Sequence, residues 1–161
     1  MHLCGIVFYH PKNPQNLGDM AALASHKRVP LVVVQRPGEQ VRPALPPRAR
    51  VITVQDIREV GNVFKEALYL VLETYGLRFI EEIELQEGNQ GCLVLVVGAE
   101  DYGIPEEEAA RLPGERIVAK IPVAVQGMSY NVVVSAAIAL YVIEAKIGEP
   151  REGTRGTGAA Q

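Results

Sequence analysis

Glycine and small polar residues follow two apolar stretches of the chain, and their types suit hydrogen bonding to a ligand. The predicted strand Leu93–Val97 ends at Gly98, where the missing side chain would let a ligand lie against the backbone. The predicted strand Ile117–Pro122 runs into a short loop, after which Ser129 and Asn131 open the last helix. The carboxyl ends of parallel strands meet at one edge of a sheet, where open α/β sheets bind ligands. We therefore expect a binding crevice at this edge.

The pattern of apolar residues predicts an α/β fold with a mostly parallel sheet. Continuous apolar runs indicate strands at His2–Tyr9, Pro30–Gln35, Arg48–Val54, Leu77–Leu85, Leu93–Val97 and Ile117–Pro122. Helical spacing, caps and stops indicate helices at Asn16–His26 (with Asn16 as N-cap), Asp56–Gly76, Pro105–Arg111 and Ser129–Ile147. The first strand, helix and strand form a βαβ unit, whose crossover should be right-handed. The proline-rich segment 36–47 should be a surface loop.

Length and composition indicate one domain of residues 1–148, followed by a disordered tail of residues 149–161. The sequence has no long uninterrupted apolar run and no leader-like N-terminus, which argues against membrane and secretory proteins and for a cytoplasmic one. Cys4 and Cys92 lie in apolar strand sequence without a CxxC pattern or a histidine cluster. We therefore expect two buried free thiols and no metal site.

The charge is distributed unevenly along the chain. Residues 1–50 carry seven basic and two acidic side chains, a net charge of +5, whereas residues 51–161 carry nine basic and seventeen acidic ones, a net charge of −8. This asymmetry suggests that the first third faces an anionic partner, and nucleic acid is the favoured one. An ordinary solvated, arginine-rich loop is the alternative. The basic residues concerned are Lys12, Lys27, Arg28, Arg36, Arg42, Arg48 and Arg50.

The last predicted helix is apolar over nearly its whole circumference, from Val132 to Ile143. One face of a sheet cannot bury such a helix on several sides. A subunit interface would bury the remainder, so we expect a homodimer.

Three sequence motifs, in order, resemble those of the SpoU (TrmH-like) branch of the SPOUT methyltransferases. The segment 13–18 (NPQNLG) is similar to the N-P-x-N-x-G loop of that family, and the segment 98–104 (GAEDYGI) is similar to its G-x-E-x-x-G-[LI] loop. Ile121-Pro122 followed by Ser129-Tyr130-Asn131 is similar to the third motif, I-P-M…S-[LM]-N. The resemblance covers about residues 3–147.

The resemblance implies a specific fold and activity. Family members thread their C-terminal segment into a deep trefoil knot, bind S-adenosylmethionine there in a bent form, and act as homodimers. They methylate the 2′-hydroxyl of a ribose in tRNA or rRNA. The chain would then be a minimal member, with the catalytic domain alone and without a metal.

The same resemblance, taken with the residue types, supplies candidate site residues. The catalytic candidates are Asn16, Glu100, Ser129, Asn131, Arg28 and His26. The adenosine would need an apolar slot in which backbone amides and carbonyls of the protein hydrogen-bond to the edge of the base. The cofactor-binding candidates that would form this slot are Leu85, Val97, Gly98, Ile121, Val125, Met128 and Ser129. The seven basic residues named above are the RNA-binding candidates. Helix capping by Ser129 and Asn131, and turn geometry at Gly98 and Gly103, are simpler explanations of those residues.

One position departs from the family pattern. The family has an arginine six residues after the second asparagine of its first motif, where this chain has Ala22. That arginine is thought to activate the ribose hydroxyl, and losing a positioned acid–base group commonly costs about 10²–10⁴-fold in rate. We expect Arg28 or His26 to take its place, across the dimer if necessary. The glycine usual in the third motif is replaced by Val125.

The sequence is also compatible with two other functions. The replacement at Ala22 would suit a knotted RNA-binding protein that has lost catalysis. A flavodoxin-like or nucleotide-binding domain is the other alternative, although no G-x-G-x-x-G or P-loop motif follows any predicted strand.

Overall fold

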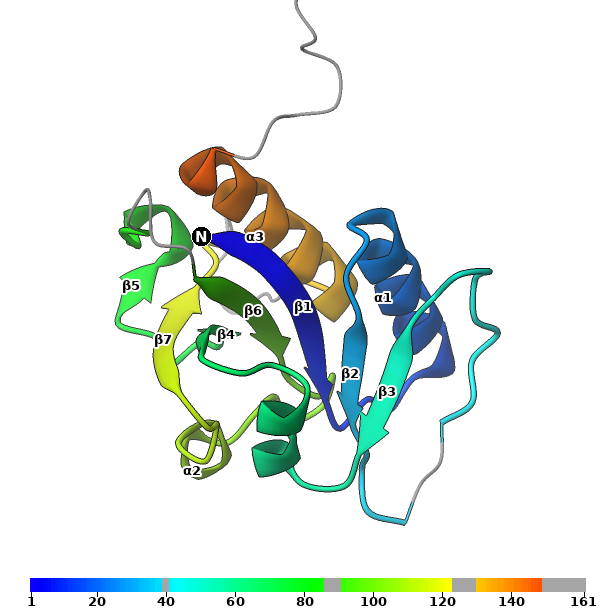
Figure 1. Ribbon diagram of the computed structural model, residues 1–161. Helices are drawn as coiled ribbons and strands as arrows, with labels where there is room; N and C mark the ends of the chain where they lie inside the picture. The colour runs from blue at the N-terminus through cyan, green and yellow to red at the C-terminus, as the bar shows by residue number, and fades with distance from the viewer. Residues whose placement is uncertain (39–40, 86–90, 123–129, 149–161) are drawn as a thin grey trace, which may run out of the picture.

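The chain forms a parallel sheet covered by helices on both faces, as the computed structural model shows (Figure 1). The structure describes residues 1–38, 41–85, 91–122 and 130–148. The strands are β1 (His2–Tyr9), β2 (Leu31–Val34), β3 (Val51–Val54), β4 (Ala67–Leu72), β5 (Arg78–Phe79), β6 (Cys92–Val97) and β7 (Glu115–Lys120). Their order in the sheet is β3-β2-β1-β6-β4-β7-β5, and each neighbouring pair is parallel. The predicted parallel α/β fold is confirmed.

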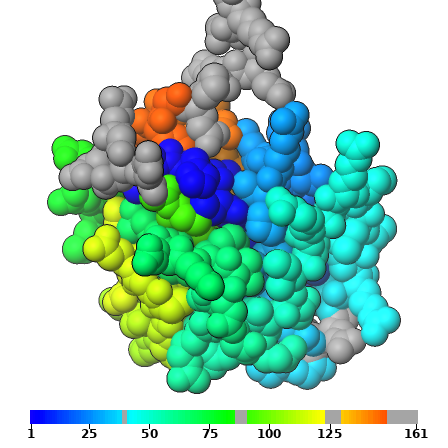
Figure 2. Space-filling model, viewed as in Figure 1, coloured from blue at the N-terminus to red at the C-terminus, as the bar shows by residue number. Residues whose placement is uncertain are grey.

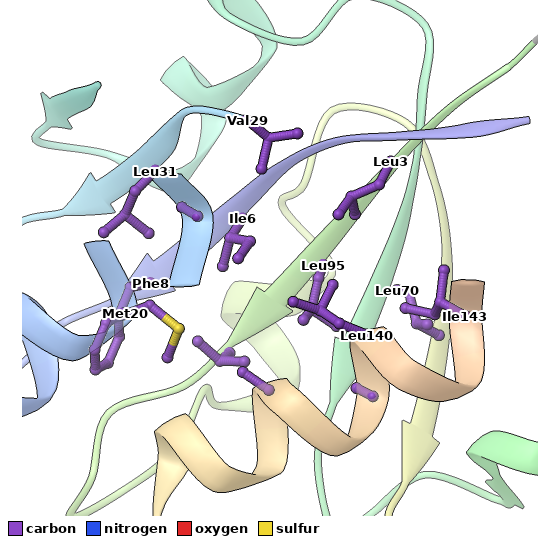
Figure 3. Close-up of a cluster of buried hydrophobic side chains, with 14 of the residues drawn as sticks. Leu3, Ile6, Phe8, Met20, Val29, Leu31, Leu70, Leu95, Leu140 and Ile143 are labelled. Carbon is purple, nitrogen blue, oxygen red and sulfur yellow. The ribbon is translucent and has the colours of Figure 1, made fainter. Parts of the chain in front are cut away.

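The central strands are apolar on both sides because both faces of the sheet are covered. One core cluster lies under α1 (Pro14–His26) and α3 (Val132–Ile147), and Figure 3 shows Met20, Leu140 and Ile143 of these helices against side chains of the strands. The other cluster lies under the 3₁₀ helix η1 (Ile57–Asn62) and the short helix α2 (Glu106–Ala109). In Figure 2 the green segment that contains η1 covers the middle of that face.

The long helix predicted for Asp56–Gly76 is wrong. The structure places η1 there, followed by β4, which lies between β6 and β7. Glu66 has a φ of +55°, which interrupts any helix just before the apolar run of β4. That run pairs with a neighbour on each side, and these backbone hydrogen bonds outweigh the helical spacing of its side chains.

Other element boundaries also differ from the predictions. Asn13 caps α1 in place of Asn16, since its Oδ1 accepts from the backbone amides of Gln15 and Asn16 at 2.8 and 3.1 Å. The strand predicted for Leu77–Leu85 is limited to β5, after which η2 (Ile80–Glu82) begins. Helix α3 begins at Val132, while Ser129 lies outside the described residues, as do Val125, Met128 and the tail 149–161. The predicted knot depends on the course of residues 123–129, so it stays a prediction.

The prediction of two free thiols is wrong. The structure joins Cys4 and Cys92 in a disulfide, with their Cα atoms 5.5 Å apart. Cys92 begins β6, and Cys4 lies where the register between β1 and β6 shifts, so the two side chains meet across neighbouring strands. Both residues are partly exposed.

No helix in the described part of the chain has the length and apolarity to cross a bilayer. Within the same residues, no group of His, Cys, Asp and Glu side chains could hold a metal ion.

Candidate functional site at the carboxyl edge of the sheet

The first and third motifs meet through two asparagine side chains. The Nδ2 of Asn131 donates to the Oδ1 of Asn16 at 3.0 Å, which joins the start of α3 to the first turn of α1. Asn131 also caps α3, because its Oδ1 accepts from the amide of Val133 at 2.8 Å. The side chain therefore caps a helix and orients a neighbouring amide at the same time. Capping, the simpler explanation, accounts for only one of its two contacts.

The second motif joins the same site through Glu100. Its carboxylate accepts from the backbone amides of Lys12, at 3.0 and 3.2 Å, and Asn13, at 2.6 Å. Asn13 in turn caps the helix that carries Asn16. A continuous set of hydrogen bonds thus runs from Glu100 through Asn13 to Asn16 and Asn131, and it brings together residues from all three motifs.

The loop of the second motif is a tight turn that closes with two backbone hydrogen bonds between Ala99 and Gly103, at 3.1 and 2.8 Å. Gly103 has a φ of +63°, which favours glycine. A Cβ on Gly98 would lie 2.5 Å from the carbonyl carbon of Gly103 and from the nitrogen of Ile104. The packing of its own loop thus requires glycine at position 98, in line with the turn-geometry explanation, and a ligand against its backbone stays a prediction.

Two residues that follow β4 in the chain form hydrogen bonds to this loop, and the sequence analysis missed both. The carboxylate of Glu73 accepts from the amide of Ile104 at 2.7 Å, and the hydroxyl of Tyr75 donates to the carbonyl of Ile104 at 2.8 Å. Burial, with the nearby charge of Glu73, raises the pKa of Tyr75 to about 12, so its hydroxyl stays protonated as a donor. The signal that would have found them is the buried apolar run of β4, whose carboxyl end they follow.

The carboxyl ends of β4, β6 and β7 form an apolar wall beside the asparagine pair. Leu72 is in register with Val97 on one side and with Ala119 on the other. Ile121 and Val132 pack as partly buried side chains against the same core cluster. Val97 and Ile121, two of the cofactor-binding candidates, therefore lie at this edge together with Gly98. Leu85 instead borders a hollow with residues of the opposite edge, among them Gly91 and Glu115, so the structure does not bring it to the others.

The structure places His26 and Arg28 away from the asparagine pair. His26 lies in the last turn of α1, about 15 Å beyond Asn16 at about 1.5 Å per residue. Arg28 follows the helix, and its carbonyl accepts from Arg50 at 3.1 Å. Within one chain, neither residue reaches the site. Ala22 is exposed on the outer side of α1.

The basic residues of the first third fall into separate groups. Lys12 and Arg36 lie at the carboxyl edge, where both approach the carboxylate of Asp101, at 3.8 and 2.6 Å. Lys27 lies near the opposite edge, where it pairs with Glu144 of α3 at 2.6 Å. Arg50 also lies there, because its carbonyl accepts a hydrogen bond from the amide of Leu31, the first residue of β2, at 2.9 Å. Arg42 and Arg48 belong to the segment between β2 and β3, which passes along α1 near Gly18.

These features define a parallel α/β protein with a polar site where three loops meet at the carboxyl edge of the sheet. The chain belongs to the SpoU rRNA Methylase family, whose model matches residues 4–141. This membership excludes the flavodoxin-like alternative.

Several solved structures share the fold. One, described with the 2′-OH methylation of C/U34 on tRNA, is 23% identical, with a TM-score of 0.74 over 90% of this chain and 96% of that one. The SpoU methyltransferase AviRb from Streptomyces viridochromogenes, in complex with AdoMet, is 17% identical, with a TM-score of 0.72 over 92% of this chain and 59% of that one. An AdoMet-bound rRNA methyltransferase from Sinorhizobium meliloti is 19% identical, with a TM-score of 0.67 over 88% of this chain and 56% of that one. No curated protein sequence matches the chain.

Proposed function

We propose that the protein is an RNA methyltransferase that uses S-adenosylmethionine and acts on a ribose 2′-hydroxyl of tRNA or rRNA in the cytoplasm. The observation that carries the proposal is the set of hydrogen bonds from Glu100 to Asn131, which joins the three motifs of the family at one edge of the sheet. Family membership supports the activity. AdoMet in two of the similar structures supports the cofactor.

The residues at this edge fit the proposed cofactor. The half-buried side chains of Leu72, Ile121 and Val132 offer apolar surface to an adenosine ring. S-adenosylmethionine supplies a methyl group already activated on a sulfonium, so a metal is not required. The asparagine pair holds two amide groups in fixed orientation beside this surface, and alignment of reacting groups supplies much of the rate in such transfers.

We include a homodimer in the proposal, with α3 at its interface. Val134, Ala137, Tyr141 and Ala145 share one exposed side of the helix, and Val134 and Tyr141 are 47% and 64% exposed. A second copy would cover this apolar strip beside the asparagine pair at the start of the same helix. Val134→Asp should shift the sedimentation of the protein from dimer to monomer, whereas Leu77→Asp, at a 94% exposed side chain next to β5, should leave it unchanged. A monomeric wild type would overturn this part of the proposal.

The decisive experiment is methyl transfer from cofactor with a labelled methyl group to total tRNA and rRNA. A 2′-O-methylated nucleotide resists alkaline cleavage at its own phosphodiester, so the label should appear in alkali-stable dinucleotides. Label on a base would contradict the proposed position. Binding of the cofactor without any transfer would favour an RNA-binding protein that has lost catalysis, and calorimetry with S-adenosylmethionine measures that binding separately.

The variant Ala22→Arg tests what replaces the family arginine. Ala22 is exposed, so an arginine there leaves the core intact. If no other residue does its work, the substitution should raise the rate by a large part of the 10²–10⁴-fold that such a group commonly contributes. If His26 or Arg28 acts across the dimer, the rate should stay the same, and His26→Ala or Arg28→Ala should lower it. Full activity in both alanine variants would remove these two residues from the mechanism.

A further inference from the structure

The turn of the second motif presents three consecutive side chains, and each has a fixed partner. Glu100 accepts from the backbone before α1, and Asp101 accepts from Arg36 in a bidentate pair at 2.9 and 2.6 Å. The third residue, Tyr102, lies at the tip with 48% of its surface exposed. A large part of the ring is therefore accessible to a ligand.

His10 and Arg36 both contact the Tyr102 side chain. Its hydroxyl lies 2.6 Å from the Nδ1 of His10, and the guanidinium of Arg36 lies 4.6 Å from the centre of its ring. Both partners are themselves fixed: the imidazole of His10 stacks on the ring of Tyr9 at 3.7 Å, and Arg36, only 12% exposed, also donates to the carbonyl of His10 at 3.0 Å. A ring held in this way loses little conformational entropy when a flat ligand stacks on it.

The ring belongs to the same edge of the sheet as the asparagine pair. His10 directly follows β1, Arg36 follows β2, and Tyr102 follows β6, so all three lie at carboxyl ends of neighbouring strands. Tyr102 is two residues from Glu100, whose hydrogen bonds lead to Asn16. Lys12, 58% exposed, lies beside it and offers a cation to a phosphate.

We propose that Tyr102 is the platform on which one unpaired base of the RNA substrate stacks, with His10 and Arg36 as positioning residues. The inference rests on the proposed function and adds the form of substrate: a nucleotide in a loop or single strand. Proteins read such RNA by stacking splayed bases on aromatic rings and guanidinium planes, because the deep groove of a paired RNA helix excludes side chains. The stacked base would lie beside the ribose to be methylated.

The test compares Tyr102→Leu with Tyr102→Phe in the full chain. Trace-labelled total tRNA and total rRNA are titrated with each protein at constant salt, and affinity for S-adenosylmethionine is measured by calorimetry. Loss of a stacked base weakens binding by about 5- to 150-fold, so the leucine variant should lose that much RNA affinity. The phenylalanine variant keeps the ring and should stay within about threefold of wild type. Both should bind the cofactor as wild type does, which also shows that they fold.

A double-mutant comparison separates positioning from general damage. His10→Asn removes the same hydrogen bond as Tyr102→Phe. It should therefore lower RNA affinity by no more than about threefold when Tyr102 is present, and it should have no further effect in the Tyr102→Phe background, where the hydroxyl is missing. Equal losses in both backgrounds would assign His10 a purely structural role.

Three results with the leucine variant would overturn the inference while leaving the proposed function untouched. The first is equal RNA affinity in the leucine variant and wild type, and the second is an equal loss in the leucine and phenylalanine variants. The third is a change of oligomeric state in the leucine variant, which would make the ring part of a subunit contact. The proposed function fails separately: RNA binding that depends on the ring, without methyl transfer, would support the platform and contradict the activity. A wild type that binds neither tRNA nor rRNA would overturn both.

Discussion

The two contacts of Asn131 can be separated by substitution, because one uses the side-chain oxygen and the other the side-chain nitrogen. The oxygen caps α3 through the amide of Val133, and the nitrogen donates to Asn16. Asn131→Asp keeps an acceptor at the cap and adds a negative charge that favours the start of a helix. It removes the donor that orients Asn16. We therefore expect normal stability together with impaired methyl transfer.

The expected magnitudes follow from these contacts. Asn131→Ala should lower the free energy of unfolding by about 1 kcal/mol, since loss of an N-cap costs about 0.5–2 kcal/mol. The aspartate variant should stay within about 0.5 kcal/mol of wild type. Methyl transfer should fall at least about tenfold in both variants, because misplaced reacting groups commonly cost up to about 100-fold.

Urea unfolding, and initial rates of methyl transfer at saturating cofactor, measure the two effects. Asn13→Asp is the matched control, since Asn13 caps α1 in the same way without donating to Asn16 through its side chain. It should keep both stability and most of the activity. Full activity in Asn131→Asp would refute the assignment of the asparagine pair to the site, whereas an unchanged stability in Asn131→Ala would refute the role of the cap.

Three further predictions concern the loop, the pH response and the RNA surface. Gly98→Ala should lower the free energy of unfolding by about 1–3 kcal/mol in urea, because its Cβ would lie 2.5 Å from Gly103. Burial, with Arg36 nearby, lowers the pKa of His10, so the imidazole of the unfolded protein is protonated at a higher pH than that of the folded protein. The free energy of unfolding should therefore fall as the pH drops from about 6.5 toward the lowered pKa. His10→Asn, a substitution that suits the φ of +49° at this position, should flatten this pH dependence in urea titrations at several pH values. Lys12→Ala should reduce the salt dependence of RNA binding by about one unit of log–log slope, and Lys27→Ala at the opposite edge should not; equal effects would contradict the separation of the two edges.

The fold was predictable where burial alone decides the conformation. β1 and β6 are continuous apolar runs, and the middle of a covered parallel sheet admits no other residue types. β4 has the same composition, but its apolar residues also match helical spacing with those of η1 just before it. Only the pairing of β4 with two neighbouring strands decides between a strand and a helix. That pairing joins residues far apart in the sequence, so the local spacing of apolar residues does not reveal it.

The error at β4 had a direct consequence for the site. A helix through Gly76 hides the fact that Glu73 and Tyr75 follow a strand end, and these residues fix Ile104 in the loop of the second motif. The motif residues Asn16, Glu100 and Asn131 could be found because they carry a spacing that resembles a family. Their supporting contacts come from elements elsewhere in the chain, and a local pattern does not contain them.

Helix α3 connects the proposed dimer to the chemistry of the site. Its cap residue Asn131 orients Asn16, its inner side packs in the core with Ala136 and Leu140, and its outer side exposes Tyr141. A helix anchored on one side and covered by a second copy on the other has little freedom to shift at its first turn. Because the amide of Asn131 depends on that turn, dissociation of the dimer should loosen the asparagine pair even where no partner residue touches it. When the protein is diluted so that the dimer dissociates, the rate of methyl transfer should therefore fall more steeply than the binding of the cofactor.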